Sequence, residues 1–301
     1  MPRRYQYLLG DASWERARLR AQAALWDPVS HALFDRLRIR PGWRVLEIGP
    51  GSGSLHLELR RRVRQPVDAV EQSPVFASRL AARIRRDGFG AGHVWRSELS
   101  ATALPSNHYD LIFARWVFLI LPDPEARVRQ LVTALKPGGR LVLQDYHRET
   151  FALVPRPPEW RRFMEADMAF FASQGGDASI GSRLPAFFRR AGLSLSPTHV
   201  TIKTGAPGSP VWRWLTTYFM GVMMRYASFR PFARHDAARL RRHWQQASRD
   251  PAALLIAPAV LDVVGRKRRP APNREAVKTL KKMRGRRRRR FAGIATSARA
   301  R

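Results

Sequence analysis

WRVLEIGPGSGSL, residues 43–55, joins a short apolar run to a glycine-rich turn and then to a helical pattern. The apolar run, Val45–Ile48, predicts a buried strand, and the helical pattern begins at Ser54. Glycines let the backbone reverse its direction and let a ligand approach without meeting a Cβ atom. The start of the helix presents unpaired N–H groups towards the turn. This stretch therefore predicts a strand, a turn and a helix that together form a nucleotide-type pocket.

The spacing of the glycines distinguishes this turn from the pyrophosphate-binding turn of dinucleotide enzymes. Those enzymes use GxGxxG, whereas Gly49, Gly51 and Gly53 form GxGxG. Glu47 precedes them, and a carboxylate there repels a phosphate but suits a cationic ligand. The four residues resemble motif I of the class I S-adenosylmethionine-dependent methyltransferases, which implies that they contact the cofactor S-adenosyl-L-methionine. Taken alone, the turn also fits an ordinary loop.

A second apolar run provides a candidate for binding the ribose. This run, Val67–Val70, predicts a strand that ends at Glu71, 22 positions after Gly49. An acid about 20 residues beyond the first glycine, at the carboxyl end of the second strand, can accept hydrogen bonds from both ribose hydroxyls. We therefore expect Glu71 to bind the ribose of the cofactor, with Gln72 beside it in the same site.

The next two strands contribute further candidate contacts. The resemblance implies an acidic or polar adenine contact just after the third strand, predicted at His93–Arg96, which makes Glu98 or Ser100 the candidate. The Gly-Asp pair that is usual at this point is absent. Arg115 follows the fourth strand and is expected to face the methionine carboxylate of the cofactor or an anionic substrate. A surface arginine is the alternative for Arg115.

The middle of the chain extends the resemblance. YDLIFA, residues 109–114, predicts a fourth strand, a helix begins at Asp123-Pro124, and LKPGGRLVLQD, residues 135–145, ends that helix and forms a fifth strand. These segments resemble the same methyltransferase class, so the resemblance spans about residues 43–146. Alternating strands and helices predict a parallel sheet. The expected fold is α/β, a Rossmann-like, doubly wound, seven-stranded and mostly parallel sheet. The resemblance implies an antiparallel last strand at about Val260–Gly265.

Two helices are predicted before the first strand. The first covers residues 14–25, and the second begins at Asp27-Pro28, with aspartate as the cap and proline in the first turn. The pattern YxYLLG followed by ERxRLRxQ resembles an amino-terminal segment of some methyltransferases, which implies that Tyr5 and Gln22 contact the cofactor. An ordinary packed pair of helices is the alternative.

The chain is expected to have four parts. These are an N-terminal helical cap over residues 1–40, a cofactor-binding core over 41–150, a lid with closing strands of the same domain over 151–265, and a basic tail over 266–301. The lid region should contain helices at 159–171 and 184–191 and a strand at 195–204. VWRWLTTYFMGVMMRYASF, residues 211–229, is rich in aromatic residues and methionine. It predicts a core helix or a lid over an apolar substrate.

Composition excludes several kinds of chemistry. The chain of 301 residues has no cysteine, which excludes disulfides, thiolate metal sites and a cysteine nucleophile, including the thiol-adduct route to pyrimidine C5 methylation. We expect no metal site. The amino terminus lacks an apolar signal core and no run of 18 residues is free of charge, which predicts a cytoplasmic protein without a membrane span.

The positive charge is concentrated at one end. The formal net charge is +32, and residues 266–301 contribute +15 of it, with five consecutive arginines at 286–290. Like charges at this density repel one another, so a solvated, disordered tail is expected. Nonspecific contact with nucleic acid or an acidic surface is the functional alternative.

A methyl acceptor that must lose a proton needs a general base. Ligands in such sheets bind beyond the carboxyl ends of the strands, and this rule selects among the histidines. His93 and His108 precede their strands, whereas His147 follows the fifth strand. His147 is therefore the candidate base, and a pocket or loop residue without catalytic function is its alternative.

The pattern as a whole predicts an enzyme that methylates a small, apolar or aromatic acceptor. It resembles the ubiquinone and menaquinone C-methyltransferases and the natural-product methyltransferases. An RNA methyltransferase guided by the basic tail is the first alternative. Against it, Ala114-Arg115-Trp116 stands where exocyclic-amino methyltransferases have Asn/Asp-Pro-Pro-aromatic. A catalytically silent S-adenosylmethionine-binding protein is the second alternative.

Overall fold

The computed structural model describes residues 13–85 and 88–270. The predicted contact Tyr5 and all but the first five residues of the predicted tail lie outside this part of the chain. By its internal contacts the chain divides into two units, Met1–Lys267 and Arg268–Arg301. The elements described below belong to the first unit.

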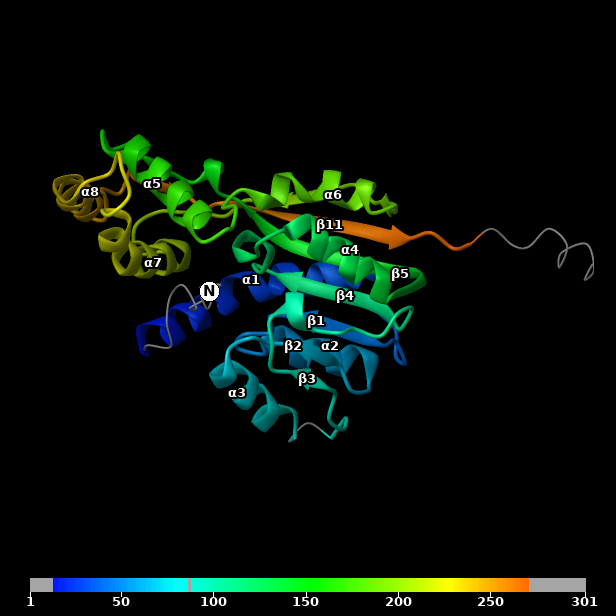
Figure 1. Cartoon of the computed structure of the whole chain (residues 1–301). Coiled ribbons are helices and arrows are strands. Elements are labelled where there is room, and N and C mark those ends of the chain that lie inside the picture. Colours follow the sequence, from blue (N-terminus) through cyan, green and yellow to red (C-terminus); the bar gives the residue numbers. More distant parts are fainter. Residues whose placement is uncertain (1–12, 86–87, 271–301) are drawn as a thin grey trace, which may run out of the picture. The chain divides into compact units, whose positions relative to one another are not determined.

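The central sheet has the order β3-β2-β1-β4-β5-β11-β7, and β8 pairs with β11 beside this path (Figure 1). Its strands are β1 (Val45–Ile48), β2 (Asp68–Val70), β3 (Val94–Trp95), β4 (Tyr109–Arg115), β5 (Leu135–His147), β7 (Leu193–Leu195), β8 (His199–Thr201) and β11 (Ala259–Lys267). The strands from β3 to β5 are parallel, and β11 is antiparallel to β5, with Ala259 opposite His147. This arrangement confirms the Rossmann-like α/β expectation and its antiparallel last strand, but the sheet has eight strands rather than seven, because β8 also pairs with β11.

Eight α-helices accompany these strands in the described residues. They are α1 (Ser13–Leu37), α2 (Ser54–Val63), α3 (Pro74–Ile84), α4 (Pro124–Ala134), α5 (Trp160–Ser173), α6 (Leu184–Arg190), α7 (Pro210–Tyr226) and α8 (Arg234–Ala247). In Figure 1, α5, α7 and α8 lie together, away from β1, β2 and β3. Short 3-10 turns follow β3, β4 and β5 at Leu99–Ala101, Phe118–Ile120 and Arg148–Thr150.

The start of α3 illustrates how local sequence sets these elements. Ser73 has extended backbone angles, and its side chain accepts a hydrogen bond from the N–H of Phe76. Pro74 occupies the first turn, where its missing N–H costs nothing. Phe76, Leu80 and Ile84 are buried on one face.

The predicted start of a second helix at Asp27-Pro28 is wrong, because α1 continues through this point. A proline inside a helix removes one backbone hydrogen bond, so contacts on both sides of it must compensate. The Asp27 carboxylate accepts a hydrogen bond from Arg115 at 2.7 Å rather than capping a helix. Trp26 is 1% exposed and packs edge-on against Trp116. Tertiary contacts therefore hold one helix where the local signals predict two.

The region predicted as a lid contains a second sheet and a helix that the sequence analysis did not assign. The second sheet has the antiparallel order β6 (Ala152–Val154), β10 (Leu254–Ile256) and β9 (Thr204–Gly205). The single strand predicted over 195–204 is wrong, since three short strands occupy this part of the chain. Pro197, between β7 and β8, cannot donate a hydrogen bond to a ladder, which explains the first interruption.

Aromatic side chains form the core of the lid region. Phe219 of α7 is fully buried and stacks on Trp244 of α8, with ring centroids 4.3 Å apart. Phe163 of α5 lies 4.9 Å from the ring of Phe219. One face of α7 thus belongs to the core. Among the described residues, no helix is both long and apolar enough to cross a membrane.

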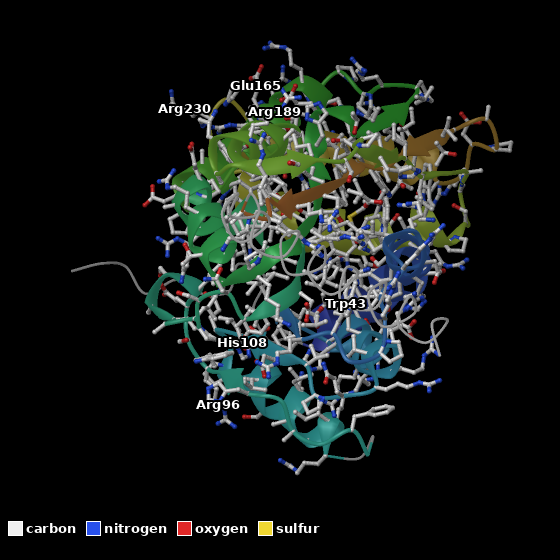
Figure 2. The ribbon with its side chains drawn as sticks, turned by 90° about the vertical axis from the view of Figure 1, so that its right-hand side faces the viewer. Trp43, Arg96, His108, Glu165, Arg189 and Arg230 are labelled. Carbon is white, nitrogen blue, oxygen red and sulfur yellow. The ribbon has the colours of Figure 1, made fainter. Side chains whose placement is uncertain are left out.

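The surface of the first unit carries exposed arginine residues. Arg96, Arg189 and Arg230 are exposed and lie at its periphery (Figure 2). Most of the acids near the surface of the helices pair with arginines, as Glu165 does with Arg161. The positive charge is therefore shared between this unit and the tail.

The glycine turn closes tightly against the segment that follows β4. Gly49, Gly51 and Gly53 have φ values of +63°, +52° and +76°, which non-glycine residues rarely adopt. A Cβ atom on Gly49 would lie 2.6 Å from a methyl group of Val117. Gly49 therefore meets both a backbone and a packing constraint.

Asp145, near the end of β5, fixes the segment after β4 from the other side. Its carboxylate accepts hydrogen bonds from the backbone N–H groups of Phe118, Leu119 and Tyr146 at 2.9, 3.2 and 2.9 Å. Burial raises the pKa of Asp145 to about 7, although the three donors oppose this change. The carboxylate joins the carboxyl ends of β4 and β5.

We predict that Gly49→Ala lowers the free energy of unfolding by about 2–4 kcal/mol, because backbone strain and overlap with Val117 add. Gly42→Ala is the matched control, since Gly42 has φ +83° but no atom within 4 Å of a built Cβ. It should cost only the strain, about 1–2 kcal/mol. Adding Val117→Ala to Gly49→Ala should restore part of the loss. Equal losses for the Gly49 and Gly42 variants in urea unfolding would contradict the packing constraint.

We predict that Asp145→Asn lowers the free energy of unfolding by about 1–3 kcal/mol at pH 8, where the carboxylate is ionised. Both carboxylate oxygens accept backbone N–H groups, so either orientation of an amide turns its NH₂ group towards a donor. Asp250→Asn is the control, because the described contacts use only Oδ1 of Asp250, which accepts from Ala252. A loss as small as that of the control would show that Asp145 does not hold the two strand ends.

Candidate functional site

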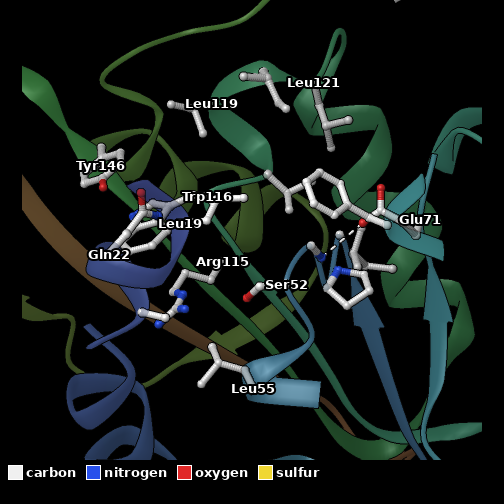
Figure 3. A pocket seen from close by; sticks show the side chains of 18 of the residues that line it. Leu19, Gln22, Ser52, Leu55, Glu71, Arg115, Trp116, Leu119, Leu121 and Tyr146 are labelled. Atoms are coloured by element: carbon white, nitrogen blue, oxygen red, sulfur yellow. Dashed lines mark hydrogen bonds between the residues drawn. The ribbon is translucent and has the colours of Figure 1, made fainter. Parts of the chain in front are cut away.

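A cavity lies at the carboxyl ends of β1, β2, β4 and β5, which is where ligands bind in sheets of this type (Figure 3). The glycine turn and the segments after β2 and β3 form one side of it. Helices α1, α5 and α7 and the ends of β4 and β5 form the other side. Its lining includes Glu47, Gly49, Gly51, Glu71, Gln72, Gln22 and Arg115 from the predicted site.

Glu71 joins two loops on the glycine side of the cavity. Its Oε2 accepts a hydrogen bond from the N–H of Gly51 at 3.1 Å, drawn as a dashed line in Figure 3. Its Oε1 accepts from the N–H of Ser73 at 2.9 Å. The side chain is 6% exposed, so the protein orients the carboxylate at the edge of the cavity. The expected ribose contact remains a prediction.

Glu47 is oriented by a histidine that the sequence analysis missed. Nδ1 of His56 lies 3.0 Å from Oε2 of Glu47, and His56 is fully buried on α2. The pairing fixes one carboxylate oxygen of Glu47, which is itself 3% exposed and lines the cavity. The two residues are only nine positions apart, and a histidine on the first turn after a glycine motif is the sequence signal for this contact.

Arg115 lines the cavity but is held by α1. One guanidinium nitrogen donates to Asp27 at 2.7 Å, and the other donates to the Ser30 hydroxyl at 3.0 Å. The guanidinium also lies 4.5 Å from the centroid of the Trp116 ring. Arg115 is therefore no ordinary surface arginine, while its contact with a cofactor or substrate carboxylate stays a prediction.

Aromatic side chains dominate the other side of the cavity. Trp116 and Tyr146 stack with centroids 5.1 Å apart and an interplanar angle of 12°. In Figure 3, both lie near Gln22, on the side opposite Glu71. The remaining aromatic and apolar lining of this side includes Phe170 and Phe171 of α5 and Trp214, Leu215 and Tyr218 of α7. One face of α7 therefore packs in the core and another lines the cavity, while its covering of an apolar substrate stays a prediction.

A buried ion pair lies at this aromatic side. Arg148 donates from Nε and Nη2 to the two carboxylate oxygens of Asp167, at 2.7 and 2.8 Å. Asp167 is fully buried and Arg148 is 4% exposed. The nearby carboxylate and phenols hold the pKa of Arg148 well above its usual range, against the effect of burial. Sequence reasoning missed this pair, because its partners lie on different elements 19 residues apart.

Several predicted residues do not line the cavity. Gly53, Glu98 and Ser100 are outside the lining, although Ser97 and Leu99, on either side of Glu98, belong to it. Glu98 accepts a hydrogen bond from the Ser100 hydroxyl at 3.3 Å. His147 is the last residue of β5 and is also outside the lining. Its Nδ1 is buried and has no hydrogen-bond partner within the described part of the chain. The roles predicted for these residues remain untested.

The residues of the glycine side fit S-adenosylmethionine. Gly49 and Gly51 carry no Cβ at the floor of the cavity, and the acids of the described lining, Glu47 and Glu71, both lie on this side. Carboxylates suit a cofactor with a sulfonium, an amino group and two ribose hydroxyls. Leu99 and Val117 add apolar surface.

Comparison with known proteins agrees with this fit. A family model described as a methyltransferase domain matches residues 15–196, more than half of the chain. A ribosomal protein L11 methyltransferase of Rhizobium leguminosarum is 36% identical over 112 residues, which are 36% of this chain and 37% of that protein. A ubiquinone/menaquinone biosynthesis C-methyltransferase of Vibrio vulnificus is 27% identical over 130 residues, 40% of this chain and 50% of that protein.

A solved structure shares the fold over most of the chain. The YcgJ protein of Bacillus subtilis has a TM-score of 0.55 and 18% identity, covering 80% of this chain and 98% of that one. The chain spans about half or less of the length of the two curated relatives. The family match covers the glycine turn, Glu71 and most of the sheet. The chain therefore belongs to the methyltransferase domain family, the S-adenosylmethionine-dependent methyltransferases, and its cofactor is S-adenosyl-L-methionine.

Proposed function

We propose that this protein transfers a methyl group to a small, apolar or aromatic acceptor. The observation that supports this most directly is the composition of the cavity, whose glycine side continues into a wall of aromatic side chains. Concave, mostly apolar sites with a few polar groups are typical of small-molecule binding. The partial similarity to a quinone C-methyltransferase agrees with such an acceptor.

The residues have distinct proposed roles. Glu71 receives the ribose hydroxyls, and Glu47, oriented by His56, provides negative charge beside the glycine turn. Bound S-adenosylmethionine supplies an activated methyl group on its sulfonium. The main task of the protein is then to hold the acceptor in line and to exclude water, which can contribute about 7–11 kcal/mol. Trp116, Phe171 and Trp214 cover the acceptor side and perform this task.

The cavity offers little for removing a proton. No histidine is present among the described lining residues, whose titratable groups are Arg18, Glu47, Glu71, Arg115, Tyr146, Arg148 and Tyr218. Burial raises the pKa of both tyrosines, so their phenols stay protonated. This favours an acceptor that is already ionised, since it can attack the methyl group without first losing a proton to the protein. The proposed base His147 is the last residue of β5 and lies outside this lining, so it would have to move to reach the acceptor.

Methyl transfer from radiolabelled S-adenosylmethionine to a panel of phenols, quinols and aromatic acids tests the proposal. We expect label in an extractable small product with at least one acceptor. Trp214→Ala should lower kcat/KM by about tenfold or more, because the variant loses a buried indole ring that lines the acceptor side of the cavity. Trp43→Ala is the control, since Trp43 does not line the cavity. Tight cofactor binding with no labelled product from any acceptor would support the catalytically silent alternative.

RNA methylation remains the second candidate, because residues 266–301 carry +15. A chain shortened after Pro270 distinguishes RNA methylation from methylation of a small acceptor. The cut must follow Lys267, because this residue is the end of β11 and its Nζ donates to the carbonyls of Val132 and Leu135 at 2.8 Å. We expect unchanged transfer to the small acceptor, and only salt-sensitive, sequence-independent RNA binding by the intact chain. Label transferred to RNA, and lost on shortening, would favour the RNA methyltransferase.

A further inference from the structure

The guanidinium of Arg148 is surrounded by three aromatic rings at the acceptor side of the cavity. Its Cζ lies 5.9 Å from the ring centroid of Tyr146, 5.3 Å from that of Phe171 and 5.1 Å from that of Tyr218. The side chain is 5% exposed and lines the cavity. A buried cation in an aromatic enclosure needs strong fixation, since its desolvation is costly.

Hydrogen bonds fix only part of this guanidinium. Nε and Nη2 donate to Asp167, and Nη2 also donates to the hydroxyl of Tyr218 at 3.0 Å. That hydroxyl lies 2.8 Å from the hydroxyl of Tyr226, which holds it in place. Nη1 makes no hydrogen bond to any described residue. The corner of the guanidinium farthest from Asp167 therefore keeps two N–H donors and positive charge without a partner among the residues that the structure describes.

Tyr146 adds a second hydrogen-bond donor, a neutral hydroxyl that also has no partner among the described residues. Its ring is stacked on Trp116, so the position of its hydroxyl is fixed by packing. This hydroxyl has no hydrogen-bond partner in the part of the chain that the structure describes. Burial raises the pKa of Tyr146, so the hydroxyl stays protonated and donates. Tyr146 and Arg148 are two positions apart and both line the cavity.

We infer that Nη1 of Arg148 and the hydroxyl of Tyr146 bind an oxygen anion carried on a planar, apolar ring of the acceptor. The inference deepens the proposed function and rests on it. Charged donors hold anionic oxygens more strongly than neutral ones, and the acids of the described lining lie on the glycine side, away from this corner. A second guanidinium, that of Arg18, lies 5.9 Å from the Tyr218 centroid.

A carboxylate and a phenolate share this chemistry, and matched probes separate them. 2-Naphthoate is compared with its neutral isostere 2-naphthamide, and 4-nitrophenolate with 4-nitroanisole. Each is titrated by calorimetry into the full chain in the presence of S-adenosylhomocysteine, whose own binding is measured first. We expect at least one anion to bind about tenfold or more tightly than its neutral counterpart. Preference in one pair alone identifies the kind of anion.

Two variants connect the preference to these residues. Tyr146→Phe keeps the stacked ring and should lower the affinity for the preferred anion by about three- to tenfold. Arg148→Met is combined with Asp167→Leu, so that no unpaired charge is left buried, and should abolish the preference. Tyr109→Phe is the control, because the Tyr109 hydroxyl donates to Asp68 and Tyr109 does not line the cavity. It should leave the preference unchanged.

The outcomes separate this inference from the proposed function. Suppose that S-adenosylhomocysteine binds. If neither anion then binds more tightly than its neutral counterpart, or if none of the four probes binds, the inference is wrong and the proposed function stands. A preference that persists in the Arg148→Met, Asp167→Leu variant also overturns it. If S-adenosylhomocysteine does not bind, the proposed function fails and the inference fails with it.

Discussion

The rest of the site depends on the contact between the Glu71 carboxylate and two backbone N–H groups, those of Gly51 and Ser73. This contact joins the turn after β1 to the start of α3, and it places an acid beside glycines that have no Cβ. Asp145 does the same for the ends of β4 and β5. Two buried carboxylates thus hold the four strand ends that surround the cavity.

The lid region completes the cavity with a helix that packs in the core on one face and lines the cavity on another. Phe219 of α7 packs against Trp244, while Trp214 and Tyr218 of the same helix line the cavity. The aromatic wall is therefore as fixed as the core behind it. A preformed wall lowers the entropic cost of holding an acceptor in line. The Arg148–Asp167 pair lies between the wall and the core and gives this apolar region one polar corner.

Local patterns in the sequence predict the sheet, because each strand, turn and helix around Gly49, Glu71 and the fifth strand carries its own signal. They also predict that Glu47 and Glu71 reach the cavity, since the carboxyl ends of parallel strands meet, but they select Glu98 as well, which does not line it. Contacts between distant segments leave no such pattern. Arg115 and Asp27 are 88 residues apart, and their pairing carries α1 through Pro28, where local rules predict a new helix. Arg148 and Asp167 escaped prediction for the same reason.

The central claim is that Glu71 and the glycine turn hold S-adenosylmethionine, and calorimetric titration tests it most directly. The cofactor and S-adenosylhomocysteine are titrated into the wild type, Glu71→Gln, Glu71→Ala and the exposed control Glu149→Ala, with unfolding temperatures measured alongside. The account predicts binding in the wild type and the control, and a loss of about tenfold or more in both Glu71 variants while they remain folded. Equal binding in all four proteins, or none in the wild type, would contradict it.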